Sequence, residues 1–278
     1  MAADLVNVLA ALKALRGVDL SGYRHDTLQR RVAARMATAQ AADVDEYARQ
    51  LYTDPDECDR LINTITIKVS SFFRDPIVFE LTAQKLLGDI IDRNRRKDAP
   101  GGDIRVWSAG CATGEEAWSL AILIHQALKG EGSNWTVQIF ATDLDPNALA
   151  TAETGAYPGD RFKNVKLGVL DQYFDANEDG YRIRPFLRRM VRFSRDDLVS
   201  TQRHAPAESV FGTFDLIFCR NVLIYYSRDV QGHIFRRLHR SLGRQGYLVL
   251  GNAEGLNTEM ESKLQTIDRM NRIYRKPR

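Results

Sequence analysis

The spacing of apolar residues divides the chain into a helical first third and a region where strands and helices alternate. Up to about residue 92, apolar side chains recur every three or four positions, the period of helices that bury one face. The next stretch, Arg93–Gly102, is charged and ends in Pro-Gly-Gly, which predicts a loop. From Asp103 onwards the pattern predicts alternating strands and helices.

Four apolar runs in the second region predict buried strands: IRVWSAG, WTVQIFATD, FDLIF and GYLVLG. Helices are predicted for GEEAWSLAILIHQALKG and for DPNALATAETG, and an amphipathic helix for Arg228–Leu242. This alternation predicts an α/β fold, a parallel sheet with helices on both faces. Between Tyr157 and Met190 the short runs YRIRP and MVRF predict a small β-rich insertion, and RIYRK predicts a last strand at or near a sheet edge.

Composition narrows the class of protein. A chain of 278 residues with 44% hydrophobic and 27% charged residues is expected to form one large or two unequal globular domains. A net charge of +3 is too small to predict nucleic-acid binding, and no apolar run approaches the roughly 18 residues of a membrane span. The N-terminus predicts an amphipathic helix instead of a signal peptide. Three scattered cysteines predict neither a disulfide framework nor a metal site and fit a reducing cytoplasm.

The first predicted strand ends in a glycine turn, Gly110-Cys-Ala-Thr-Gly114, and two acids then open a helix. Parallel sheets bind ligands outside the carboxyl ends of their strands, and glycine lets the backbone approach a ligand closely. The turn is not G-x-G-x-x-G, and Glu115 and Glu116 would repel a pyrophosphate but suit a cationic group. The alternative is that these acids only complement the helix dipole.

Acidic residues follow two further strands. Asp143 closes the second strand, where a carboxylate is placed to bind ribose hydroxyls, although it can also be a simple turn residue. Asp145 is better explained as a helix cap. Asp196 or Asp197 precedes Leu198, and an acid beside an apolar residue can bracket a purine ring; the alternative is a solvated loop.

A neutral amide, Asn221, follows FDLIF-Cys-Arg at the ligand end of its strand. Together with the glycine turn and Asp143, it describes a nucleoside pocket. Acids stand where a phosphate would need donors, so the expected ligand is S-adenosylmethionine, which carries an ammonium and a sulfonium but no phosphate. Earlier in the chain, Arg74 follows two phenylalanines, where it can bind a carboxylate or simply lie on the surface.

The chain resembles the chemotaxis receptor glutamate methyltransferases, the CheR family. The resemblance runs from about residue 10 to the end and is carried by SSFFRDP, RVWSAGCATGEE, FATDLD, FDLIFCRNVLIYY and GYLVLGNAEGL. It implies a class I, Rossmann-like methyltransferase domain over 68–278, with a β-subdomain at about 156–192, and an all-helical receptor-docking domain over 1–67. The implied reaction transfers a methyl group from S-adenosylmethionine to receptor glutamates, forming methyl esters in chemotaxis adaptation and releasing S-adenosylhomocysteine.

The resemblance also implies roles for residues at matching positions. Arg74 and Tyr225 would lie at the point of methyl transfer. Asp197 stands where some relatives have asparagine. The implied cofactor-binding residues are Ser70, Arg74, Glu115, Asp143, Asp197, Leu198, Asn221 and Val222. No metal is implied, and no general base is needed, because a glutamate with a pKa of about 4.3 is already ionised at neutral pH.

A basic helix is the expected handle for the substrate. At about 100° per residue, Arg24, Arg31 and Arg35 fall within roughly 40° and flank an apolar stripe of Leu28, Val32 and Met36. We expect the stripe to pack inward and the three guanidiniums to form one exposed edge. Such an edge can be an ordinary solvated face; the resemblance implies that it docks acidic receptor helices.

The resemblance implies a monomer in the cytoplasm, recruited to membrane receptor arrays, that binds the cytoplasmic helices of chemoreceptors and neither nucleic acid nor the membrane itself. A shortened loop, Asp175–Gly180, favours an enzyme that needs no C-terminal receptor pentapeptide. The alternatives are a methyltransferase acting on another protein or on nucleic acid, a non-catalytic cofactor-binding module and, less consistent with the glycine turn, a nicotinamide dehydrogenase.

Overall fold

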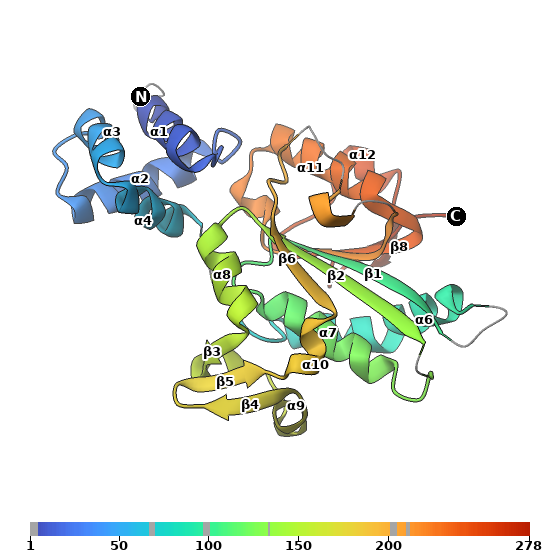
Figure 1. Ribbon diagram of the computed structural model, residues 1–278. Coiled ribbons are helices and arrows are strands. Elements are labelled where there is room, and N and C mark those ends of the chain that lie inside the picture. The colour runs from blue at the N-terminus through green and yellow to red at the C-terminus, as the bar shows by residue number, and fades with distance from the viewer. Residues whose placement is uncertain (1–4, 67–69, 97–100, 133, 201–204, 210–211) are drawn as a thin grey trace. The chain divides into compact units, whose positions relative to one another are not determined.

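The computed structural model describes residues 5–66, 70–96, 101–132, 134–200, 205–209 and 212–278. The chain divides into two compact units, drawn in Figure 1. The first comprises Met1–Lys68 and Tyr225–Gln231, and the second comprises Val69–Ile224 and Gly232–Arg278. The domain boundary predicted between residues 67 and 68 lies outside the described residues.

The first unit is helical, as its apolar spacing predicts. Capping fixes two helix starts, because the Asp43 carboxylate accepts from the Glu46 N–H and the Asp54 carboxylate from the Asp56 N–H. Pro55 then occupies the first position of its helix. The helices are α1 (Val6–Arg16), α2 (His25–Ala39), α3 (Val44–Thr53) and α4 (Pro55–Ile65).

The apolar stripe of α2 packs inward, as predicted, for Leu28 and Val32, which are buried, while Met36 is half-buried. The expected edge of three exposed guanidiniums is wrong for Arg35. Its Nε and Nη2 each donate to a carboxylate oxygen of Glu57 over 2.6 Å, so it is committed to the fold of this unit. Arg31 is half-buried, and Arg24 is exposed.

Glu57 is the centre of a buried ionic cluster between α2, α3 and α4. Its side chain is 5% exposed, and it also accepts from the Tyr47 hydroxyl at 2.8 Å and from Arg60 Nε at 2.8 Å. Burial alone would raise the pKa of Glu57, but the hydrogen bonds from Arg35, Arg60 and Tyr47 outweigh it and lower the pKa to about 2. The carboxylate therefore stabilises the folded unit only while it is ionised.

A segment from late in the chain completes the first unit. Tyr23 pairs with Tyr226 in an antiparallel bridge, and its ring stacks on Tyr225 with centroids 6.2 Å apart. The Arg24 N–H donates to the Tyr225 carbonyl at 2.8 Å, just where α2 begins. The backbone of Tyr225 is therefore fixed by the turn that opens the basic helix.

The second unit contains the alternating elements. Its helices are α5 (Pro76–Leu81), α6 (Leu87–Asn94), α7 (Glu115–Ala127), α8 (Pro146–Thr154), α9 (Leu167–Tyr173), α10 (Pro185–Arg188), α11 (Arg228–Ser241), which begins within the first unit, and α12 (Thr258–Glu261). A π-helical turn, Thr82–Leu86, joins α5 to α6. Since α6 runs to Asn94, the predicted loop from Arg93 starts two residues too early, and residues 97–100 lie outside the described residues.

Seven of the described strands form one sheet in the order β6-β2-β1-β7-β8-β10-β9. They are β1 (Gly102–Ala109), β2 (Trp135–Asp143), β6 (Val191–Arg195), β7 (Phe214–Cys219), β8 (Leu242–Leu250), β9 (Gln265–Asp268) and β10 (Ile273–Arg275). The ladders from β6 to β8 are parallel, as predicted. The sheet as a whole is mixed, because β10 runs antiparallel to both β8 and β9.

The β-rich insertion is smaller than the short apolar runs predict. Its three-stranded antiparallel sheet has the order β3 (Ala156–Pro158), β5 (Gly180–Ile183), β4 (Phe174–Asn177). The run MVRF was expected there, but it forms β6 and pairs with β2 at the edge of the large sheet. In the β4–β5 hairpin, Asn177 pairs with Gly180, so the connection is short; independence from a receptor pentapeptide stays a prediction.

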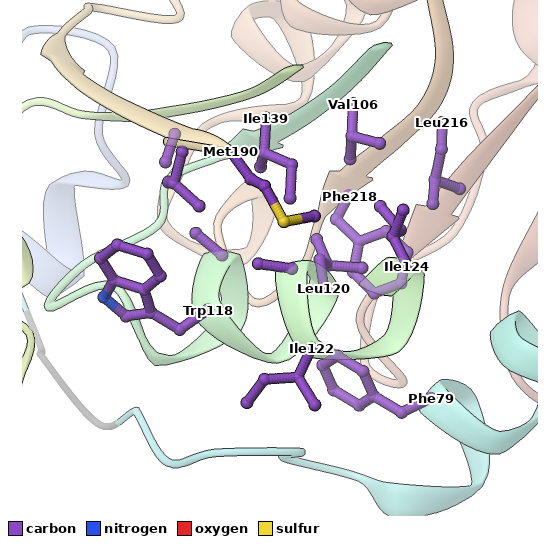
Figure 2. Packing of buried hydrophobic residues seen from close by; sticks show 14 of the residues in the cluster. Phe79, Val106, Trp118, Leu120, Ile122, Ile124, Ile139, Met190, Leu216 and Phe218 are labelled. Atoms are coloured by element: carbon purple, nitrogen blue, oxygen red, sulfur yellow. The ribbon is translucent and has the colours of Figure 1, made fainter. Parts of the chain in front are cut away.

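Alternate residues of the large sheet bury their side chains under α7. Figure 1 shows α6 and α7 on one side of the sheet and α11 on the other. In Figure 2, Leu120 and Ile124 of α7 point toward the strands, while Ile122 points to Phe79. The strand residues that meet this helix include Val106, Ile139, Leu216 and Phe218. Because α7 is buried on both sides, its first turn is held rigidly at the end of β1.

None of the described helices is long and apolar enough to cross a membrane.

The ionic cluster of the first unit predicts a pH-dependent stability. Replacing Glu57 with Gln removes the charge, and the gap between its ordinary pKa of 4.5 and about 2 corresponds to roughly 3 kcal/mol. A lowered folded-state pKa contributes stability above pH 4.5 that is lost as pH falls toward 2. Hydrogen exchange of α3 and α4 peptides in the intact chain should therefore accelerate in the variant at pH 7 and differ much less at pH 3, after correction for intrinsic rates.

The matched control is Asp59→Asn, which breaks the half-buried pair with Arg16 and should cost about 1 kcal/mol or less. Equal destabilisation by Glu57→Gln at both pH values would contradict the assignment, because a loss through packing alone does not titrate.

Candidate functional site

The carboxyl ends of five neighbouring strands meet at one edge of the large sheet. The chain proceeds from β1 to β2 to β6 on one side and from β7 to β8 on the other. The order therefore reverses between β1 and β7, and open α/β sheets bind their ligands at such a switch point. The candidate residues after β1, β2, β6 and β7 are brought together here.

The glycine turn after β1 is fixed by packing as well as by conformation. Gly110 has φ +77°, and its N–H donates to the Thr142 carbonyl at 2.8 Å. A Cβ at Gly110 would lie 2.4 Å from Val222 Cγ2, so only glycine lets the turn close against the segment after β7. The contact between Gly110 and Val222 also shows that Val222 lies at the glycine turn.

Glu115, the first residue of α7, is fully buried. One of its carboxylate oxygens accepts from the Thr113 hydroxyl at 2.7 Å. The other, Oε1, is buried without a hydrogen-bond donor among the described residues and has Arg161 Nη1 at 3.5 Å as its charge partner. A buried carboxylate oxygen with an unused hydrogen-bonding position is suited to a ligand ammonium group.

Glu116 has a different environment. Its carboxylate accepts from the Ser108 hydroxyl at 2.7 Å and lies 3.7 Å from Arg220 Nη1. Burial raises the pKa of Glu116, although Arg220 and Ser108 counteract it. These internal partners make Glu116 part of the scaffold.

Asp143 ends β2 and binds the glycine turn. Its carboxylate accepts from the Ala112 N–H at 2.8 Å and from the Asp145 N–H at 3.0 Å, and its side chain is half-buried. Asp145 caps α8 through the N–H groups of Asn147 and Ala148, which confirms the prediction of a helix cap. Asp143 thus belongs to the edge of the sheet and reaches the turn after β1.

The two acids after β6 separate into different roles. Both oxygens of Asp196 accept from Arg237 Nη2 at 2.9 Å, in a pair that is almost fully buried. Asp197 accepts from the Val199 N–H at 2.9 Å, and Leu198 is buried. Asp196 is therefore committed to Arg237, and the role of Asp197 at the adenine stays a prediction.

Asn221 adopts φ +60°, an uncommon conformation for a residue with a Cβ. A buried carboxylate, Glu254, holds it: Glu254 accepts from the N–H groups of Asn221, Val222, Leu223 and Gly251 at 2.7–2.9 Å. Glu254 was not among the residues predicted from the sequence. The available signal was an acid in GNAEGL directly after a fully apolar strand.

The Ser70–Arg74 segment is fixed to the same unit from two sides. Arg161 Nη1 donates to the Ser70 carbonyl at 2.6 Å, and the Phe73 N–H donates to the Ser119 hydroxyl of α7 at 3.0 Å. Arg220 Nη1 donates to the Arg74 carbonyl at 3.1 Å. Neither Arg161 nor Arg220 was predicted from the sequence, although Arg220 was visible as a cation between a buried strand and Asn221.

Tyr225 and the three arginines of the predicted docking edge belong to the first unit. Tyr225 stacks on Tyr23, and Arg35 binds Glu57.

The thiols of Cys111 and Cys219 are buried, and burial raises their pKa values well above the ordinary value. Neither is therefore a thiolate nucleophile. Within the described residues no cluster of three or more His, Cys, Asp or Glu could hold a metal ion.

Sequence models of two known domains match almost the whole chain. The model described as "CheR methyltransferase, SAM binding domain" matches residues 68–273, and "CheR methyltransferase, all-alpha domain" matches residues 3–66.

Curated relatives are similar over the same span. A "Chemotaxis protein methyltransferase" of Escherichia coli is 31% identical over 247 residues, covering 87% of this chain and 80% of the relative. One of Listeria monocytogenes is 30% identical over 252 residues, covering 91% and 90%. An uncharacterised 104.1 kDa protein of Rhodobacter capsulatus is 33% identical over 273 residues. The matched region covers 98% of this chain and 27% of that relative.

The orphaned oxygen of Glu115, the carboxylate of Asp143 and the closely packed glycine turn fit the ammonium and ribose of S-adenosylmethionine. With domain models covering residues 3–66 and 68–273, the chain belongs to the CheR family of S-adenosylmethionine-dependent methyltransferases.

Proposed function

We propose that this protein transfers a methyl group from S-adenosylmethionine to glutamate side chains of chemoreceptors and forms glutamate methyl esters. The observation that carries the proposal is the buried Glu115 beside the glycine turn, because its Oε1 is suited to the amino group of the cofactor. The chemotaxis methyltransferases of Escherichia coli and Listeria monocytogenes support the choice of a chemotaxis substrate.

The remaining cofactor contacts follow from the strand ends. We assign the ribose to Asp143, because a carboxylate can accept about four hydrogen bonds and this one stands half-buried at the end of β2. The adenine is assigned to Asp197 and Leu198, where a polar side chain adjoins a buried apolar one. Asn221 and Val222 would line the pocket beside the glycine turn, since Val222 packs against Gly110, and Ser70 would lie at the methionine end.

The proposed chemistry requires alignment more than acid–base catalysis. S-adenosylmethionine supplies a methyl group already activated on a sulfonium. A substrate glutamate is ionised at neutral pH, so the residues of this chain need only hold its oxygen in line with the methyl group. We assign that orientation to Arg74, with Tyr225 at the transfer site.

Substrate docking is assigned to the basic helix α2. Arg24 occupies the N-cap position of α2, where a cation is unfavourable to the helix dipole, so helix stability does not explain it. Arg31 is half-buried, and its Nε is buried without a hydrogen-bond partner among the described residues. We propose that Arg24 and Arg31 attract acidic receptor helices and that Arg35 acts only through Glu57.

The family models support a docking domain at residues 1–67 and a methyltransferase domain at 68–278, since they match 3–66 and 68–273. We propose that the protein acts in the cytoplasm as a monomer that is recruited to the cytoplasmic helices of membrane receptors.

Tritiated methyl transfer to receptor-bearing membranes tests the reaction. The wild-type protein should give label that mild base releases, because esters hydrolyse and methylated nitrogen does not. Arg74→Ala should lower the rate about 100-fold, since a misplaced carboxylate loses the alignment on which the step depends. S-adenosylhomocysteine affinity, measured by calorimetry, shows whether the variant still forms its cofactor site.

Base-stable label would contradict the proposed glutamate substrate. An unchanged rate in Arg74→Ala would remove Arg74 from the reaction while leaving the substrate assignment intact.

Charge reversal on α2 tests docking. Arg24→Glu with Arg31→Glu should raise the receptor KM about tenfold at low salt, with a smaller effect at high salt, because screening weakens attraction between exposed charges. The affinity for S-adenosylhomocysteine should not change. The measurement is the rate of methyl transfer against receptor concentration at two ionic strengths.

Arg30→Glu is the matched control, because Arg30 is exposed on another face of the same helix. If Arg30→Glu raises KM as much as the double variant, net charge matters and the specific edge does not. Arg35→Glu should instead destabilise the first unit, because it places a second acid against Glu57.

A further inference from the structure

A buried arginine joins two motifs that lie far apart in the sequence. The side chain of Arg220, directly after β7, is 1% exposed. Its Nη2 donates to Asp75 Oδ2 at 2.6 Å, and its Nη1 donates to the Arg74 carbonyl at 3.1 Å. One guanidinium therefore binds both the backbone of Arg74 and the side chain of the next residue.

Arg220 is itself held in place. Its Nη1 lies 3.7 Å from Glu116 Oε2 in the first turn of α7, and its guanidinium carbon lies 5.8 Å from the centre of the Phe79 ring. A guanidinium removed from water needs such charge partners, and both belong to buried helices of the core. Arg220 thus connects the carboxyl end of β7 to the segment that carries Arg74.

The backbone on both sides of Arg74 is in an uncommon conformation. Phe73 has φ +51° and Asp75 has φ +58°, in the left-handed region that bulky residues seldom adopt. Such conformations persist only where the surroundings enforce them, and they concentrate at functional sites. The Ser119 hydroxyl enforces the first by accepting from the Phe73 N–H, and Arg220 enforces the second through Asp75.

We infer that Arg220 and Asp75 are positioning residues that fix the backbone of Arg74 and thereby direct its guanidinium toward the carboxylate it orients. The inference rests on the proposed function of Arg74. Neither residue needs to touch substrate or cofactor for this role. It explains why an arginine stands between an apolar strand and Asn221, and why an acid follows Arg74.

Asp75→Ala tests the role, because Asp75 is 37% exposed and Arg220 keeps the Arg74 carbonyl and Glu116 as partners. We expect kcat to fall about tenfold, while the receptor KM and the affinity for S-adenosylhomocysteine stay within about threefold, since docking and cofactor contacts remain. Arg220→Lys keeps the charge but cannot reach both partners with two nitrogens, and it should lower kcat similarly.

Two comparisons separate positioning from general stability. Asp89→Ala is the control, because Asp89 is 36% exposed and its carboxylate also binds arginines, Arg93 and Arg275, of which Arg275 lies beside the early residues of β8. It removes bonds to Arg93, Arg275 and Tyr247, so it should also lower the melting temperature, but it should leave kcat unchanged. The double variant Asp75→Ala/Arg220→Lys should show no lower kcat than the single variant with the lower kcat, because the two residues act as one unit.

Hydrogen exchange supplies a readout that needs no activity. Peptides spanning residues 73–80 should exchange faster in Asp75→Ala than in wild type and be unaffected in Asp89→Ala. If wild type methylates no receptor, the proposed function fails, and this measurement still decides whether Asp75 and Arg220 hold the segment. Unchanged exchange, unchanged kcat in both variants or multiplying losses in the double variant would each overturn the inference.

Discussion

A carboxylate taken out of water must find donors, and the buried acids of this chain differ in how completely they do so. Glu254 accepts four backbone N–H groups, and Glu57 accepts from two arginines and a tyrosine. Glu115 is buried as deeply, yet among the described residues its Oε1 has no hydrogen-bond donor and has Arg161 Nη1 as a charge partner at 3.5 Å. The satisfied acids form the framework, and the incompletely satisfied one marks the site.

The sheet order determines where that site lies. The order of the parallel strands reverses between β1 and β7. The segments that follow β1, β2, β6, β7 and β8 therefore all lie at the carboxyl end of the sheet. Two of these segments are fixed by a carboxylate from another strand end: Asp143 holds the glycine turn, and Glu254 holds Asn221. The strained backbone around Arg74 depends on the same edge through Arg220.

The sequence predicted most features that depend on local signals. The strand and helix pattern, the inward stripe of α2 and the Asp145 cap follow from periodicity and capping chemistry, which act over a few residues. The ion pairs did not follow, because Arg35 and Glu57 are 22 positions apart and Asp75 and Arg220 are 145 apart. Helical spacing placed Arg35 on an edge but carried no information about its partner. Likewise, the composition of MVRF predicts a strand without saying which sheet it joins.

The central claim is that Glu115 binds the amino group of the cofactor. The most direct measurement is calorimetric titration of the wild-type protein and Glu115→Gln with S-adenosylhomocysteine and with its analogue lacking the amino group. Wild type should bind the complete ligand about tenfold or more tightly than the analogue, a difference of about 1.4 kcal/mol, and Glu115→Gln should hardly distinguish them. The same preference in both proteins would contradict the claim.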